Sequence, residues 1–103
     1  MKSKAYARIG LAMKAGKLVS GEDTCMKAIK KGKGKLVIIA SDSTSNTCKR
    51  FNNMCKHRNI PCIEWGTKEE LGKSIGKHYR AVVCVIDESF AQVIMEKLSG
   101  GEA

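Results

Sequence analysis

Residues 21–27 begin with a glycine and two acidic residues and end with a lysine. The segment begins Gly21, Glu22, Asp23, Thr24, and Lys27 follows one helical turn later. A glycine at a helix start leaves the free backbone amides open to a nucleic-acid backbone, and an acid there can accept hydrogen bonds from the amino or imino edge of a base. Lys27 can reach a phosphate or the acceptor edge of a guanine. These residue types at this spacing indicate a contact with nucleic acid.

The same residues also have a purely structural interpretation. Ser20 can accept a hydrogen bond from the amide of Asp23, and the Asp23 carboxylate can reach back to Ser20, which makes a capping box. Glu22 and Asp23 also complement the positive end of the helix dipole. We therefore expect Ser20 to cap a helix here, and that role alone would account for the segment's composition.

A second group of residues with binding chemistry follows Gly76. Lys77, His78, Tyr79 and Arg80 offer two cations, an imidazole and an aromatic ring in a short connection. Aromatic and guanidinium planes in loops are surfaces on which splayed-out RNA bases stack. The alternative is an ordinary basic connection in which Tyr79 packs on the edge of the domain.

Positive charge is concentrated in the first part of the chain. The first 35 positions hold ten of the 19 Lys and Arg residues and only two of the 10 acids. Such an asymmetric field attracts a polyanion, and nucleic acid is the leading candidate, although a solvated basic surface would give the same composition. The cations nearest to the helix start that can supply this attraction are Lys27, Lys30, Lys31, Lys33 and Lys35.

Helical and strand-like patterns alternate along the 103 residues, which suffice for one domain over 1–103. Two runs without polar alternation, 36–40 and 81–86, should be strands covered on both faces. The alternation predicts an α/β layered domain with helices on both faces of a sheet, and a frayed tail from residue 99. Further strands are expected at 17–19 and 62–65, and helices at 3–15, 21–31, 47–58, from a Thr67 cap to residue 76, and around Phe90, Val93, Ile94 and Leu98.

The five cysteines give little sign of a disulfide framework or a standard zinc site, because their number is odd and no C-x-x-C is present. We expect the cysteines to behave as small buried hydrophobic residues of a protein in the reducing cytoplasm. A metal site built from Cys48, Cys55 and Cys62 remains the alternative. The sequence also shows no stretch that would cross a bilayer and no signal peptide, so we expect a cytoplasmic protein that does not bind membranes.

Groups suited to catalysis are few. His57 and His78 lie in basic surroundings without an obvious carboxylate partner, and no pair of acids lies in an apolar context. The glycines of 32–35 precede a strand instead of following one, and 72–74 lacks the earlier glycine of a P-loop. We expect neither an enzyme nor a bound cofactor or metal, with a cysteine nucleophile paired with a histidine as the alternative.

The helix start at 21–27 and the loop 76–80, in this order along the chain, resemble the corresponding parts of the kink-turn RNA-binding ribosomal protein family. This family is typified by the archaeal and eukaryotic large-subunit proteins seven-Ae and thirty-e. The chain is most similar to the small bacterial, YlxQ-like branch of that family. The resemblance covers about 7–98. The stretches that carry it are 21–27, 27–32 leading into 35–42, 71–76, and the thirty-e-like loop 76–80.

The resemblance implies a three-layer α-β-α sandwich around a mixed four-stranded sheet. It also implies that the helix start at 21–27 enters kinked RNA and contacts the guanines of tandem sheared G·A pairs, and that the loop at 77–80 packs against a flipped-out base. Family members commonly have Asn-Glu where this chain has Asp23 and Thr24. Aspartate can accept a hydrogen bond from guanine but cannot donate one, and threonine has no carboxylate.

Our leading expectation is a monomeric, non-enzymatic protein that recognises a kink-turn in ribosomal or regulatory RNA and stabilises its bent form. Its specificity would come from residues 21–24 and its attraction from the lysines. Because of the Asp23-Thr24 difference, a protein-interaction adaptor that keeps the fold without the RNA site is the alternative. A small nucleotide-binding or cysteine-dependent enzyme is a third hypothesis.

Overall fold

A mixed four-stranded sheet organises the chain in our computed structural model, which describes residues 4–99. The strands are β1 (Leu18–Ser20), β2 (Leu36–Ile39), β3 (Cys62–Glu64) and β4 (Val82–Val85). They lie in the order β1-β4-β2-β3, with β4 antiparallel to both of its neighbours and β2 parallel to β3. Consequently the ends of β1, β2 and β3 and the start of β4 lie at one end of the sheet, which we call the tip end.

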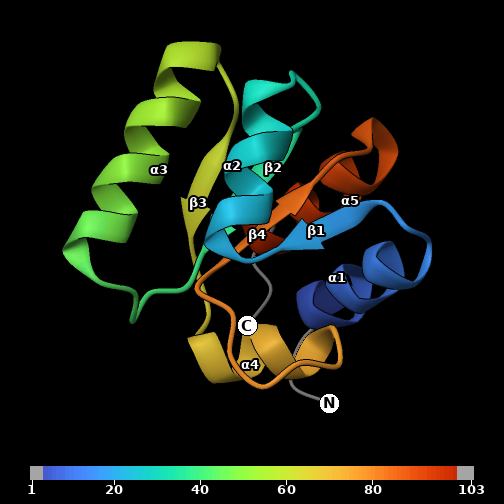
Figure 1. Cartoon of the computed structure of the whole chain (residues 1–103). Helices are drawn as coiled ribbons and strands as arrows, with labels where there is room; N and C mark the ends of the chain where they lie inside the picture. Colours follow the sequence, from blue (N-terminus) through green and yellow to red (C-terminus); the bar gives the residue numbers. More distant parts are fainter. Residues whose placement is uncertain (1–3, 100–103) are drawn as a thin grey trace.

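Helices cover both faces of the sheet (Figure 1). On one face lie α1 (Lys4–Lys14), α4 (Lys68–Ser74) and α5 (Glu88–Ser99), and on the other lie α2 (Glu22–Lys30) and α3 (Ser45–Arg58). The predicted three-layer α-β-α sandwich with a mixed sheet is therefore confirmed. Within residues 4–99, none of the helices combines the length and apolar character that crossing a membrane requires.

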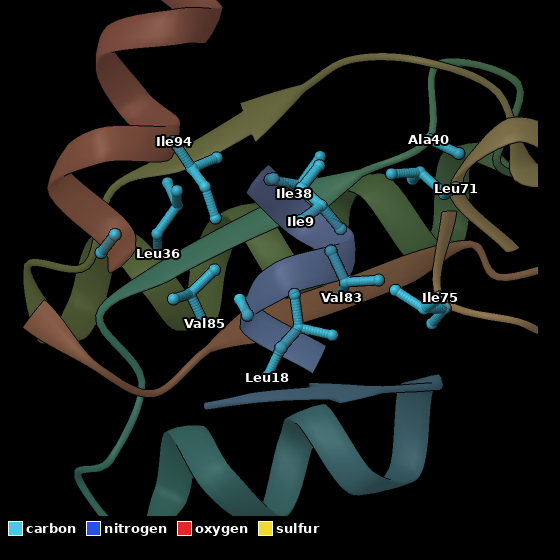
Figure 2. Packing of buried hydrophobic residues seen from close by; sticks show 12 residues of the cluster. Ile9, Leu18, Leu36, Ile38, Ala40, Leu71, Ile75, Val83, Val85 and Ile94 are labelled. Atoms are coloured by element: carbon cyan, nitrogen blue, oxygen red, sulfur yellow. The ribbon is translucent and has the colours of Figure 1, made fainter. Parts of the chain in front are cut away.

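The unbroken apolar runs of β2 and β4 are explained by two hydrophobic cores, one on each side of the sheet. Alternate strand residues point to opposite faces. Leu36 and Val83 face α1, α4 and α5 in the core of Figure 2, whereas Val37 and Cys84 face α2 and α3. All four side chains are fully buried. Because both strands are covered on both faces, polar alternation is absent from their sequences.

Threonine side chains cap two of the helices. Thr67 Oγ1 accepts a hydrogen bond from the Glu70 amide at 3.1 Å, as predicted. The third helix begins two residues before the predicted start, because Thr44 is its cap and accepts from the Thr47 amide at 3.2 Å. Caps of this kind contribute about 1 kcal/mol each.

Several predicted element bounds differ slightly from those observed. The first strand lies one residue later than predicted. The third ends at Glu64, which pairs with Ile39 at the end of β2, and the Trp65 amide still donates to the Ile39 carbonyl at 2.8 Å. Ser99, predicted to fray, ends α5 with its hydroxyl donating to the Met95 carbonyl at 2.8 Å. The predicted helix start at residue 3 and the tail 100–103 lie outside the described residues.

Candidate nucleic-acid interface

The start of α2 has a backbone conformation that requires glycine. Gly21 is the N-cap residue with φ 93° and ψ 150°, a region that side-chain-bearing residues rarely enter. Its amide donates to the Val82 carbonyl at 3.0 Å, and its carbonyl accepts from the Cys25 amide at 2.9 Å. A Cβ atom added at Gly21 would meet no atom within 4 Å, so the helix start borders open space.

The predicted capping box at Ser20 is wrong. Ser20 is the last residue of β1, and no side chain caps α2. The Ser20 hydroxyl instead accepts a hydrogen bond from Arg80 Nε at 3.0 Å. The hydroxyl is therefore occupied by a residue that lies far away in the sequence, and the first turn of α2 keeps its amides unbound by any capping side chain.

This hydrogen bond brings the two sequence groups together at the tip end. Arg80 also donates from Nη1 to the Tyr79 carbonyl at 2.8 Å, so the guanidinium joins the loop 76–80 to the end of β1. The Tyr79 side chain is 62% exposed, which contradicts the alternative in which its ring packs on the domain. Figure 1 shows this loop, in orange, at the same end of the molecule as the start of α2.

Close packing against α4 shapes the same loop. The Lys77 amide donates to the Gly72 carbonyl at 2.8 Å. A Cβ atom on Gly72 would lie 2.6 Å from the His78 carbonyl carbon and 2.8 Å from the Tyr79 amide nitrogen. Gly72 was not among the predicted site residues, although a glycine inside a helical pattern is costly and usually has a packing or functional reason.

The side chain of Glu22 is held between the starts of α2 and α3. Its Oε2 accepts from the Thr47 hydroxyl at 3.2 Å, and its Oε1 lies 3.5 Å from Arg50 Nη1. Asp23 and Thr24, by contrast, are exposed, and neither side chain caps α2. Glu22 thus fixes the position of the helix start, while Asp23 and Thr24 can meet a ligand.

The predicted lysines divide into two groups. Lys27, Lys30 and Lys31 are exposed, and helical spacing places them on the same side of α2 as Asp23. Lys33 and Lys35 follow the opposite end of α2. The Lys35 amide donates a hydrogen bond to the Val85 carbonyl, whereas the Gly21 amide donates to the Val82 carbonyl. Three residues of strand separate these two positions, which is about 10 Å.

Two of the buried cysteines lack the reactivity of a catalytic thiol. Cys25 and Cys84 lie in the core beneath α2 and α3, where burial raises the pKa of both thiols, to about 12 for Cys84. Such thiols stay protonated near neutral pH and are poor nucleophiles. Among the described residues, no group of three or more His, Cys, Asp or Glu side chains could hold a metal ion.

Comparison with known proteins connects this site to a family. The model of the ribosomal protein L7Ae/L30e/S12e/Gadd45 family matches residues 3–95. The chain is 40% identical over 93 residues to RNA-binding protein YlxQ of Bacillus subtilis, covering 90% of this chain and 93% of that protein. It is 36% identical over 99 residues to RNA-binding protein YlxQ of Enterococcus faecium, covering 96% and 95%. Neither relative carries the name of an enzyme.

Solved structures show the same fold. A protein of unknown function from Bacillus halodurans C superposes with a TM-score of 0.90 at 34% identity, covering 93% of this chain and 97% of that one. The Giardia lamblia 15.5kD RNA binding protein superposes with a TM-score of 0.79 at 19% identity, covering 92% and 82%. At the lower identity, the likeness concerns the fold alone.

Proposed function

The chain belongs to the ribosomal protein L7Ae/L30e/S12e/Gadd45 family, and on that premise we propose that it is an RNA-binding protein whose target is a kink-turn. The relatives named RNA-binding protein YlxQ support the broader part of this proposal. The geometry of the tip end supports the finer part, because an exposed helix start and an exposed aromatic loop lie side by side there.

The hydrogen bond from Arg80 Nε to Ser20 Oγ is the observation that carries the proposal. It fixes the loop 76–80 against the end of β1, one residue before Gly21. A single RNA could therefore meet both groups without any rearrangement of the protein. Preorganisation of this kind lowers the entropic cost of binding.

Each group at the tip has a distinct chemical task in this proposal. The Asp23 carboxylate accepts hydrogen bonds from the amino and imino groups of a guanine, and the Thr24 hydroxyl can donate or accept. The free amides after Gly21 approach the phosphate backbone closely. Tyr79 offers its ring to an unstacked base. Glu22 acts only through position, because Thr47 and Arg50 occupy its carboxylate.

The lysines supply attraction with different reach. Lys27 lies one turn behind Asp23 and can touch the RNA that the tip engages, and Lys30 continues the same exposed side of α2. Lys33 and Lys35 lie at the far end of the sheet. At physiological salt, exposed charges separated by more than about 8 Å are largely screened. We therefore assign direct contact with the kink to Lys27, and to Lys33 and Lys35 only a weaker attraction for RNA that passes the far end of α2.

A gel-shift titration tests the proposal with two RNAs. One contains a kink-turn, and the other carries Watson–Crick pairs in place of the tandem sheared G·A pairs. We expect tight binding to the first RNA only. Lys27→Ala should weaken it by about 1–3 kcal/mol if the amine reaches a base edge, whereas Lys14→Ala, an exposed change on α1, should have little effect.

Two outcomes would contradict the proposal. Equal and weak binding to both RNAs would favour an adaptor that keeps the fold, or binding by charge alone. A loss of only a few tenths of a kcal/mol for Lys27→Ala would remove that residue from the recognition surface.

A further inference from the structure

Residues 24–63 form an almost acid-free segment. They contain nine Lys and Arg residues and a single acid, Asp42. The segment comprises most of α2, together with β2 and α3, and seven of the nine cations lie on α2, on its C-cap residue or on α3, in the helical layer on one face of the sheet. Helix α3 contributes four of the cations and has no acid in its 14 residues.

The two helices of this layer lie side by side and begin at the same end (Figure 1). Contacts from Glu22 to Thr47 and Arg50 join their starts. On α3, helical spacing places Lys49 and Lys56 on the side opposite to the buried residues, and both are exposed. We define the α2–α3 face by its exposed cations, which are Lys27, Lys30, Lys31, Lys49, Arg50 and Lys56.

The acids near this face are fewer than its cations. One of them is Glu64 at the end of β3, whose carboxylate accepts a hydrogen bond from Asn52 Nδ2 of α3 at 3.3 Å. Both acids of α2 lie in its first turn, and Glu22 is bound by Arg50. Asp42 lies in the loop before α3, where its Oδ1 accepts from the Lys68 amide at 2.9 Å. Beyond the first turn of α2, neither helix carries a carboxylate. Like charges held together in this way repel one another, and a polyanion relieves that repulsion.

The face also lacks the apolar anchors that protein interfaces use. Among the described residues, the exposed large hydrophobic side chains are Leu11, Tyr79 and Val93, and none of these lies on α2 or α3. Protein–protein interfaces are typically centred on buried aromatic or aliphatic side chains, with lysine depleted. A surface of lysines without such anchors fits a phosphate backbone better than a protein.

We propose that the α2–α3 face binds the phosphate backbone of a double-stranded RNA stem that leaves the kink, an inference that rests on the proposed function. The 14 residues of α3 span about 20 Å at 1.5 Å per residue. At roughly 3.4 Å per phosphate of one strand, this length meets about six phosphates. The contact is independent of base sequence, because it consists of lysine and arginine meeting phosphate.

A salt titration with RNAs of different stem length tests this inference. The kink-turn RNA is prepared with long stems and with each stem in turn cut to a few base pairs. The variant is Lys49→Gln/Lys56→Gln, two exposed changes to a good helix former. The matched control is Lys4→Gln/Lys14→Gln on α1, which removes the same charge from the other layer.

We expect the α3 variant to lower the salt slope of binding by about 1.8 on the long-stemmed RNA, since each of the two lost phosphate contacts lowers it by about 0.9. If the two proteins bind equally at 1 M salt, this corresponds to a loss of roughly 60-fold at 0.1 M salt. Shortening the stem that crosses the face should abolish the difference. The control variant should keep the wild-type slope.

The inference would be overturned if the α3 variant and the α1 control variant had the same salt slope of binding to the long-stemmed RNA, whether both kept the wild-type slope or both lost it. So would an α3 variant that binds long-stemmed RNA normally but loses affinity for polyglutamate, because the face would then serve an acidic protein. Lys27→Ala separates this failure from failure of the proposed function. If it weakens kink-turn binding while the α3 variant does not, only the stem contact is wrong.

Discussion

Replacing Gly72 with alanine should shift the loop that carries Tyr79. The glycine lies in α4, with the backbone of His78 and Tyr79 directly above its Cα atom. A Cβ there would lie 2.6 Å from the His78 carbonyl carbon, 2.8 Å from the Tyr79 amide nitrogen, and closer still to the His78 carbonyl oxygen. Ordinary contacts between such atoms are about 3.5 Å, so the loop must move by about an ångström.

Two opposing effects determine the magnitude. Alanine is a better helix former than glycine by about 1 kcal/mol. Inserting a methyl group into a packed site costs about 1–3 kcal/mol, and here the atoms that must yield are backbone atoms. The Lys77 amide would also be drawn away from the Gly72 carbonyl, which it contacts at 2.8 Å. We expect a net destabilisation of about 1–2 kcal/mol, or roughly 4–15 °C in Tm.

Urea denaturation of wild type, Gly72→Ala and Lys73→Ala measures this cost. Lys73 is exposed on the same helix and forms an exposed ion pair with Glu69, so its replacement should change stability by less than about 0.5 kcal/mol. Gly72→Ala should also weaken kink-turn binding at temperatures where the protein remains folded, because Tyr79 moves. A Gly72→Ala protein as stable as wild type would refute the argument, since helix propensity would then have outweighed the contact.

Two further predictions follow from the side-chain hydrogen bonds. Arg80→Ala should weaken kink-turn binding more than Ser20→Ala. The first change removes a cation as well as the hydrogen bond that holds the loop 76–80 to β1, whereas the second removes only that hydrogen bond. Equal losses of affinity would mean that Arg80 acts through position alone. Burial and the hydrogen bond to Glu70 raise the pKa of Tyr6 to about 12, so its contribution to stability should be complete below pH 10 and lost as the pH rises toward 12. The stability difference between wild type and Tyr6→Phe, from urea midpoints, should therefore narrow across that range, and a constant difference would contradict this assignment.

Local patterns were sufficient to predict much of the fold. The apolar runs at β2 and β4 indicated strands covered on both faces, and Thr67 was identified as a cap because its partner lies only three residues away. The cap at Ser20 had the same local signature but failed. Its hydroxyl binds Arg80, which is 60 positions away in sequence, and no local pattern contains that competitor.

The same limit applies to the charge of the candidate site. A division of the chain after Lys35 makes the first part strongly basic and the rest nearly neutral, which hides the cations of α3 among the acids of α4 and α5. The fold places α3 beside α2 instead, and the acids on the opposite side of the sheet. An acid-poor window over residues 24–63 is visible in the sequence, but only the parallel packing of the two helices turns it into a surface. The proposed stem contact extends attraction to RNA from the tip end along this layer, and it predicts that the length of the RNA stem, and not only the kink, governs affinity.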